Sequence, residues 1–310
     1  MPVDIGSLLG TFSTRFLGIF IEAVSFLLLG SIISGVIGAF ISNDDLARLV
    51  PKNIVAATLV GSMLGFIFPV CECGVVPVTR RLYQKGLPVS VGITFLLAAP
   101  VMNPIVLAST YAAFGWGPVL IGRFVISWVM AVTVGLLFSL QNRPQRMIRA
   151  EALPAIAGGS GSLAITAPTP RIGLLPGLKL SFKLAGEEFF EMGRYLVIGA
   201  FLASMLQTFI AQDSLKALAT NPVNSVLVMA GLAFLLSVCS TVDAFLALSF
   251  AKTFTTGSIL TFLTFGPMVD IKSTMMYMGV FKRRTVLYMV ILPFLISVLI
   301  GIWLNLNVRF

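Results

Sequence analysis

Long apolar stretches alternate with short polar segments along the whole chain. A bilayer-spanning helix needs about 20 predominantly apolar residues. By that measure the pattern predicts eight transmembrane segments: 16–41, 54–79, 88–114, 117–140, 187–211, 224–250, 257–280 and 285–305. We therefore expect an all-α polytopic membrane protein with a first transmembrane repeat at 1–141, a linker loop at 142–186 and a second transmembrane repeat at 187–310.

The linker and the N-terminal segment carry the signals for orientation. The linker has Gly, Ser and Pro together with six basic residues, Arg143, Arg146, Arg149, Arg171, Lys179 and Lys183, so the positive-inside rule places it in the cytoplasm. Its end, GLLPGLKLSFKLAGEEF, alternates apolar and basic residues as an interfacial helix does, and we expect a second interfacial helix before Arg15. The stretch Phe16–Ile41 is too long for the apolar region of a signal peptide and predicts the first transmembrane helix.

Composition supports the membrane assignment and excludes several functions. Hydrophobic residues make up 57% of the chain and charged residues 11%, against roughly 25% charged residues in an ordinary soluble domain. The net charge of +9 reflects Arg and Lys clustered between the apolar stretches, which is typical of cytoplasmic loops rather than of nucleic-acid binding. A GxxxxGK[ST] motif does not occur, so the chain is not itself an ATPase. We expect neither an enzyme nor a cofactor.

The two halves of the chain align with each other at a nearly constant offset. The offset in residue number is 169 (191 − 22) between Glu22 and Glu191, 168 (239 − 71) between Cys71 and Cys239, and 167 (270 − 103) between Asn103 and Asp270. The aligned pairs are Glu22 with Glu191, Cys71 with Cys239, Pro100 with Pro267, and Asn103 with Asp270. Because transporters are often built from internal repeats, this predicts two four-helix repeats that face a common site.

The orientation of the repeats depends on whether any segment is re-entrant. With four full spans in each half, the repeats would insert in the same orientation, and the basic cluster 282–284 would lie outside the cell. A re-entrant segment in either half would invert the repeats, and a re-entrant 257–280 would move this cluster inside. The sequence leaves both arrangements open.

Prolines predict breaks in two of the spans. Pro100 and Pro104 lie in the span 88–114 and Pro267 lies in 257–280, and proline removes a hydrogen-bond donor and clashes with the preceding turn. Non-helical backbone at membrane depth is tolerated where it is buried or lines a polar cavity. We therefore expect Asn103 and Asp270, beside these prolines, to line a substrate site at the midplane. The alternative is that each side chain only satisfies backbone groups freed by a kink.

The cysteines suggest soft-ligand chemistry. Cys71, Cys73 and Cys239 are the only cysteines, and histidine is absent. Cys71 and Cys73 can converge only if the helix is unwound there, which neighbouring residues permit: Pro69, Gly74 and Pro77. Together with Cys239 they would form a three-sulfur set, which suits trivalent arsenic or a similar thiophilic metalloid rather than a metal ion such as zinc. A reversible Cys71–Cys73 disulfide is an equally physical alternative, and small buried hydrophobic residues are the simplest one.

Ionisable residues at membrane depth are candidates for proton coupling because each is costly unless paired. Glu72, Asp243, Asp270 and Lys272 form this group, and Lys272 is a candidate partner of Asp270. Other charged residues are expected to have structural roles. Arg80 and Arg81 are interpreted as markers of the cytoplasmic end of their helix, and Glu22 with Arg123 and Glu191 with Arg194 as structural pairs.

Four motifs are similar to those of a known family. PVCECGVVPVTRRL, FLLAAPVMNPI, LSVCSTVDAFLALSF and FLTFGPMVDIKSTMM resemble the paired motifs of the predicted permease family that includes the ArsP organoarsenical exporters and the YraQ and YcgR permeases. The resemblance implies a multi-pass permease of the bacterial inner membrane that exports by secondary transport, with arsenical resistance as the role of one subgroup. Glu72 departs from the small residue, such as Ser, that family members carry between the two cysteines.

The resulting hypothesis is an efflux permease for a small thiophilic or organic solute resembling a trivalent organoarsenical. Its partners are membrane lipid and the small-molecule substrate, and a homo-oligomer is compatible with the sequence. Two alternatives belong to other classes: an integral membrane thiol/disulfide redox protein that uses the Cys71–Cys73 pair, and a passive channel subunit.

Overall fold

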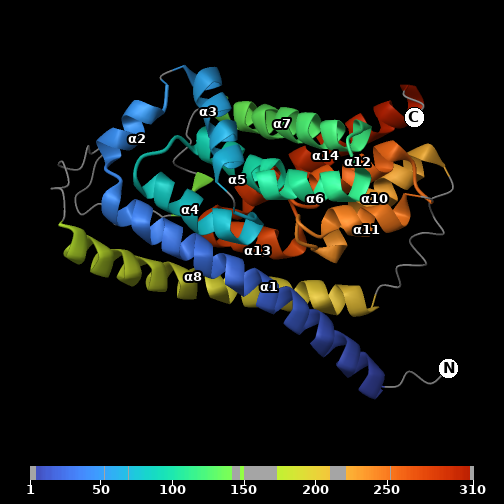
Figure 1. The fold of residues 1–310 in the computed structure, drawn as a ribbon, viewed down its shortest axis with the longest axis horizontal. Coiled ribbons are helices and arrows are strands. Elements are labelled where there is room, and N and C mark those ends of the chain that lie inside the picture. Colours follow the sequence, from blue (N-terminus) through green and yellow to red (C-terminus); the bar gives the residue numbers. More distant parts are fainter. Residues whose placement is uncertain are drawn as a thin grey trace.

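The computed structural model describes residues 5–51, 53–68, 70–141, 147–149, 173–209, 221–251 and 253–307. The helices, labelled as in Figure 1, are α1 (Ile5–Phe40), α2 (Asn43–Leu49), α3 (Ile54–Ile67), α4 (Glu72–Gln84), α5 (Val89–Met102), α6 (Pro104–Phe114), α7 (Pro118–Ser139), α8 (Leu174–Phe209), α10 (Pro222–Leu236), α11 (Asp243–Phe250), α12 (Thr256–Phe265), α13 (Ile271–Val280) and α14 (Arg283–Asn307). Within these ranges there is no strand beyond an isolated bridge between Ile148 and Phe281. The all-α class is confirmed. Pro69 and most of the linker, including Arg143, Arg146 and Arg171, lie outside the described residues.

Five helical segments among the described residues are long and apolar enough to cross a membrane. They are Gly6–Phe40, Val89–Phe114, Pro118–Ser139, Leu175–Phe209 and Arg283–Asn307. The expected spans 54–79 and 224–250 are not continuous helices, because each is divided into two short ones, α3 with α4 and α10 with α11. The breaks expected in 88–114 and 257–280 occur, and they separate α5 from α6 and α12 from α13.

Helices α1 and α8 are each 36 residues long and lie side by side in opposite directions (Figure 1). The ring of Phe12 packs 5.3 Å from that of Phe201, whereas Gly35, near the other end of α1, packs against Ser181. At 1.5 Å per residue each helix is about 54 Å long, well beyond the hydrocarbon thickness of about 30 Å. The two expected interfacial helices are therefore wrong as separate elements. No proline separates them from the spans, because Pro176 lies in the first turn of α8, where proline is tolerated.

Helices α3 and α4 form a hairpin, hereafter the first hairpin, that begins and ends at the same end of the molecule. That end, the linker end, is where α1 and α7 finish and α8 and α14 begin. Near its start, α3 packs against the last part of α7 through Thr58 and Gly135. Helix α4 runs beside α1 from Gly74, which faces Gly30, to Arg81, which faces Gly38. The first hairpin therefore turns inside the protein.

Helices α10 and α11 form the second hairpin, which begins and ends at the opposite end, hereafter the far end. Asn305, in the last turn of α14, joins the start of α10 to the start of α12. Its Nδ2 donates to the carbonyl of Pro222 (3.1 Å) and its Oδ1 accepts from the N–H of Gly257 (3.0 Å). Since α12 begins only a few residues after α11 ends, both ends of the second hairpin lie there. The two hairpins enter the protein from opposite ends.

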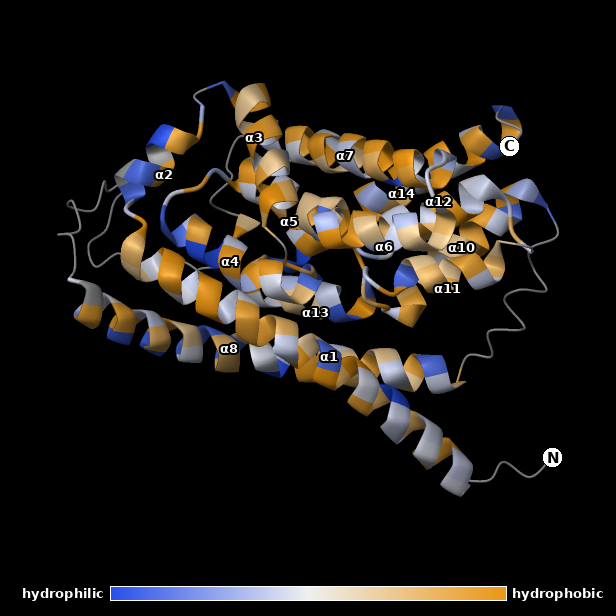
Figure 2. Ribbon diagram, in the orientation of Figure 1, coloured by the Kyte–Doolittle hydropathy of each residue, from blue (hydrophilic) through white to orange (hydrophobic). Residues whose placement is uncertain are grey.

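Large apolar side chains face outward and charged side chains are buried, the reverse of a soluble protein. Figure 2 shows many apolar residues along α1 and α7, and apolar side chains with exposed fractions of 40–70% lie on α1, α7, α8 and α14. They include Leu17, Val125, Phe201 and Leu299. The fully buried residues include Arg123 and Lys272. This distribution fits a multi-pass protein of the cell membrane whose outer surface is in contact with lipid.

Replacing Gly30 with Ala is expected to destabilise the contact between α1 and the first hairpin. A Cβ atom at Gly30 would overlap the backbone of Gly74, and small residues at such positions let membrane helices approach closely. We expect a loss of about 1–3 kcal/mol of unfolding free energy, measured by denaturant titration in detergent. Gly18→Ala, on the same helix with no atom within 4 Å of the new Cβ, is the matched control. Equal stability of the two variants would contradict the close packing.

Candidate functional site

The four breaks bring the predicted site residues into the interior. Asn103 (4% exposed) and Asp270 (2%) are buried at the α5–α6 and α12–α13 breaks. Pro100 is buried inside α5 and Pro267 in the turn before α13, but Pro104, the first residue of α6, is exposed. The break before α4 falls at Phe68, Val70 and Cys71, and Pro77 lies inside α4 rather than at the break.

Asn103 and Asp270 both cap the helices that follow them. The Oδ1 atom of Asn103 accepts the N–H of Ile105 at 2.9 Å. Asp270 forms a capping box: its Oδ1 accepts the N–H of Ser273 at 2.6 Å, and the Ser273 hydroxyl accepts the N–H of Asp270 at 2.9 Å. Each side chain therefore satisfies backbone groups at its break, as the alternative interpretation of the sequence expected, and Asp270 retains a second oxygen for another partner.

That second oxygen belongs to a buried charged triad. The Nζ atom of Lys272 lies 2.9 Å from Glu72 Oε1 and 3.8 Å from Asp270 Oδ2, and each of the three residues is only 2% exposed. Asp270 precedes the helix, so residues two apart can approach here although they would diverge within a helix. The triad holds two carboxylates against one ammonium and joins α4 of the first half to α13 of the second.

Glu72 is incompletely satisfied within this triad. Its Oε1 faces Lys272, but Oε2 is buried and no described residue donates a hydrogen bond to it. A buried polar atom without a partner costs free energy, and its retention calls for an explanation. The triad also holds two carboxylates and only one ammonium. Because Oε2 lacks a partner as well, Glu72 is the position in the triad at which a proton or a cationic group would be stabilised.

The thiols lie beside the triad. Cys71 is the N-cap of α4 and so has left the helix, and Cys73 follows in the first turn, so that the two thiols flank Glu72 of the triad. All three cysteines are buried and reduced. Cys239 lies in the turn of the second hairpin, with Sγ 3.4 Å from Thr241 Oγ1. Among the described residues, no three Cys, Asp or Glu side chains form a group that could hold a metal ion, so a three-sulfur set is not assembled in this conformation.

A second buried charged pair fixes the second hairpin. The guanidinium of Arg123 makes a bidentate contact with Asp243, at 2.9 Å to Oδ1 and 2.7 Å to Oδ2, and also donates to Thr110 Oγ1 at 2.9 Å. Arg123 is fully buried and lies on α7, whereas Asp243 begins α11. The expected pairing of Arg123 with Glu22 is wrong. One signal for such a pair was available from the sequence: an arginine lies within an apolar span, where a charge is costly without a partner.

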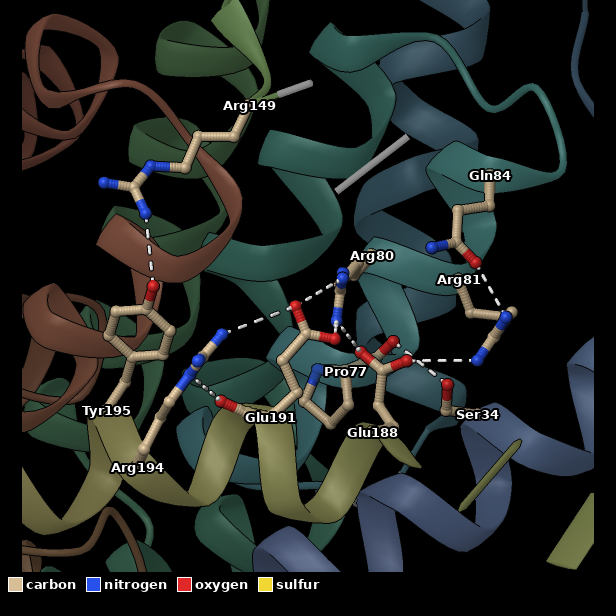
Figure 3. A network of polar contacts seen from close by, with 10 residues as sticks. All are labelled: Ser34, Pro77, Arg80, Arg81, Gln84, Arg149, Glu188, Glu191, Arg194 and Tyr195. Atoms are coloured by element: carbon tan, nitrogen blue, oxygen red, sulfur yellow. Dashed lines mark hydrogen bonds and ion pairs between the residues drawn. The ribbon is translucent and has the colours of Figure 1, made fainter. Parts of the chain in front are cut away.

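A third network joins α4 to α8 near the linker end (Figure 3). Arg80 binds Glu191 through two contacts of 2.5 and 2.7 Å and Glu188 at 3.2 Å, and Arg81 reaches Glu188 at 3.1 Å. Arg80 lies near the end of α4 and is only 4% exposed, so it is also a buried ion-pair residue. The expected Glu191–Arg194 pair exists only as a weak contact of 3.9 Å on the surface.

The three buried charged networks share one feature: each ties a hairpin to the other half of the chain. The first hairpin is bound to α13 through Glu72 and to α8 through Arg80, and the second is bound to α7 through Asp243. The turns of the two hairpins also approach each other, because Glu72 interacts electrostatically with both Cys239 and Asp243. The geometry therefore forms one buried ionisable centre built from both halves.

Comparison with known proteins gives a consistent set of relatives. A family model described as a predicted permease matches residues 8–306. The chain is 42% identical over 288 residues to the UPF0718 protein YcgR of Bacillus subtilis (92% of this chain, 94% of that protein). It is 38% identical over 280 residues to a putative two-component membrane permease complex subunit of Streptococcus mutans (89% and 88%). To the UPF0718 protein YraQ of Escherichia coli it is 27% identical over 134 residues (42% and 38%). No solved structure matches. The resemblance to these permeases is confirmed.

Proposed function

The chain belongs to the ArsP_1 family of predicted permeases, and from that premise we propose that it is a secondary permease whose substrate passes between the turns of the two hairpins. The observation that carries the proposal is the meeting of two oppositely directed hairpins at a buried ionisable centre. Transporters place substrate and coupling-ion sites at such discontinuities near the midplane, where two related halves meet. Rocking of one half against the other would then expose the centre to each side in turn.

The distribution of basic residues supports an orientation. Those at the linker end include Arg48, Arg81, Lys85, Lys179, Lys183, Lys282, Arg283 and Arg284, which makes this end cytoplasmic by the positive-inside rule. Each half then crosses the membrane three times: α1, α5–α6 and α7 in the first, and α8, α12–α13 and α14 in the second. The first hairpin is re-entrant from the cytoplasm and the second from outside. An odd number of crossings inverts the second half relative to the first.

The substrate class that the thiols favour is a trivalent organoarsenical or a similar thiophilic solute. Soft thiol ligands prefer soft ions, and Cys71 and Cys73 are both buried at the start of α4, on either side of Glu72 of the charged triad. An arsenical with one organic group and two hydroxyls would exchange both hydroxyls for sulfur, releasing two waters that take up the two thiol protons. Two sulfurs suffice for this exchange, so Cys71 and Cys73 can bind without Cys239. Glu72, Asp243, Asp270 and Lys272 are the candidates for coupling transport to protons.

Loss of the paired thiols is expected to abolish export of such a substrate. Cells that lack other arsenical exporters would accumulate a labelled trivalent organoarsenical, and the intact chain should lower that accumulation. Cys71→Ser and Cys73→Ser should each remove the effect, whereas Cys239→Ser, which lacks a second sulfur neighbour among the described residues, should retain most of it. A pentavalent arsenical, which does not exchange with thiols in this way, is the control substrate. Equal accumulation with and without the chain would reject the arsenical substrate but leave the permease assignment standing.

One observation favours a second function, because Cys71 and Cys73 are free thiols two residues apart at the start of α4, with Cys71 outside the helix, and such a pair would also suit a reversible disulfide. An integral membrane thiol/disulfide redox protein would carry this disulfide in part of its population in cells. Alkylation of membranes followed by mass spectrometry tests it, and a pair that is always alkylated at both thiols would remove the basis for the redox function.

A passive channel subunit, the third class, predicts flux without proton dependence. The Streptococcus mutans relative is named as a subunit of a two-component complex, so co-purification with a second membrane component is the matching test of partners.

A further inference from the structure

A cavity of about 770 Å³ lies at the linker end between the last turns of α7 and the first turns of α14. It is separate from the buried ionisable centre, and its volume is in the range of small-molecule sites. Its walls differ in character. Lys282, Arg283 and Arg284 provide a basic side, and Leu137, Phe138 and Leu292 provide an apolar side.

The basic side of the cavity has no acidic neighbour. No carboxylate lines the cavity among the described residues, and none of them forms an ion pair with Lys282, Arg283 or Arg284, although all three are exposed. By contrast, the buried cations Arg80, Arg123 and Lys272 each pair with a carboxylate. Arg283 and Arg284 also begin α14, where the first N–H groups of a helix lack intrahelical acceptors and favour an anion.

Hydrogen bonds fix the backbone that carries the cations. The short segment 147–149 runs antiparallel to the residues before α14, with the Lys282 N–H donating to Met147 O at 2.9 Å and the Arg149 N–H donating to Val280 O at 3.0 Å. Thr285 adds a hydroxyl bond to Met147 O at 3.2 Å. The backbone of the cluster is therefore preorganised, which lowers part of the entropic cost of binding.

The apolar side opens toward the lipid-facing surface. Leu137 is 42% exposed and Tyr288 56%, and the outer face of α14 continues with exposed Leu295 and Leu299. An occupant that contacts both sides needs an anionic head and an apolar tail. A free phosphate would leave the apolar wall uncovered, and a neutral lipid would leave the three cations without a counter-charge. The surrounding bilayer supplies molecules with both parts.

We propose that this cavity binds the headgroup and upper acyl chain of an anionic phospholipid, which bridges α7 of the first half and α14 of the second. Basic pockets between transmembrane helices on the cytoplasmic side bind lipid headgroups of this kind. The bound lipid would link the final helices of the two halves at the cytoplasmic surface. The proposal does not depend on the transported substrate.

Native mass spectrometry of the purified protein in detergent, titrated with phosphatidylglycerol, tests the proposal. The triple variant Lys282→Gln/Arg283→Gln/Arg284→Gln should bind the first phosphatidylglycerol about tenfold more weakly or worse, because each cation near an anionic headgroup contributes to binding. The matched control Arg48→Gln/Lys179→Gln/Lys183→Gln removes the same charge from exposed positions at the linker end and should bind within about twofold of the wild type.

Three results would overturn the proposal. An equal loss in both triple variants would mean diffuse surface charge, and equally tight binding of phosphatidylcholine would mean an apolar groove without headgroup recognition. Displacement of the lipid by millimolar inorganic phosphate would mean a site for free anions. Unfolding of each variant in lipid-free detergent is measured in parallel. If the triple variant does not fold, the single substitutions Arg283→Gln and Arg284→Gln are compared with Arg48→Gln in the same titration.

Discussion

Replacing Arg123 with Gln is expected to lower the free energy of unfolding by about 3–5 kcal/mol, the cost of breaking a buried ion pair by removing one partner. The arginine is fully buried, and it contacts both carboxylate oxygens of Asp243 at 2.9 and 2.7 Å. The variant would leave Asp243, itself 2% exposed, as a carboxylate without its cation at the start of α11. Denaturant titration in detergent measures the change. Loss of the pair should also free the second hairpin, so proteolysis within residues 221–251 should accelerate.

The double variant Arg123→Gln/Asp243→Asn distinguishes the free-energy cost of an uncompensated charge from the cost of lost packing. Neutral side chains of similar shape remove the buried carboxylate, so the double variant should recover most of the lost stability. Arg194→Gln is the surface control: its side chain is 61% exposed, and such a change should cost less than about 1 kcal/mol. A double variant as unstable as Arg123→Gln would show that the cost comes from packing, and a stable Arg123→Gln would show that the pair contributes nothing.

The breaks in the helices show where sequence reasoning succeeds and where it fails. Those at Asn103 and Asp270 were predictable because Pro100, Pro104 and Pro267 disrupt the helical hydrogen-bond ladder locally. The break in the second hairpin has no proline or glycine within LLSVCSTVDAF. Ser237 there adopts a φ of 46°, a conformation that serine rarely takes.

Distant residues satisfy the backbone at that break. Gln207 of α8 donates to the carbonyls of Leu235 and Leu236 at 3.4 and 2.6 Å, and Arg123 donates to the carbonyl of Ser240 at 3.5 Å. Residues far away in the sequence therefore stabilise the unwound chain, and a local pattern carries no information about them. The same applies to the division of the span 54–79, since α4 is held in place by contacts with α1, α8 and α13.

The sequence identified the buried charged residues more reliably than their partners. Glu72, Asp243, Asp270 and Lys272 were expected to matter because a charge at membrane depth is costly, and all four are buried. Only the Asp270–Lys272 contact was expected. Glu72 meets Lys272 and Arg123 meets Asp243 only after each hairpin has folded against the other half, so these pairings depend on topology. The resemblance supplied the family, whereas the apolar pattern predicted eight spans, of which 54–79 and 224–250 are each divided into two short helices.

Loss of Lys272 is expected to stop transport while most of the fold persists. Lys272→Gln would leave Glu72 and Asp270 as two buried carboxylates without the ammonium that now lies 2.9 and 3.8 Å from them. Repulsion between them would separate α4 from α13 or force one to hold a proton permanently. Either outcome removes the exchange of protons that the proposed coupling needs. Uptake of a labelled trivalent organoarsenical into everted vesicles under an imposed pH gradient should fall by about a hundredfold, which corresponds to about 2.7 kcal/mol.

Comparison of two further variants distinguishes a coupling role from a structural one. Lys272→Arg keeps the charge, so it should retain measurable uptake. The double variant Glu72→Gln/Lys272→Gln removes the closest ion pair and should regain stability against denaturant, because no uncompensated charge remains between these two residues. If the pair only holds α4 against α13, this double variant should also regain uptake. If Glu72 carries the proton, the double variant should be stable yet respond no longer to the pH gradient. Gradient-driven uptake by the stable double variant would therefore assign the pair to structure and move the coupling role to Asp243.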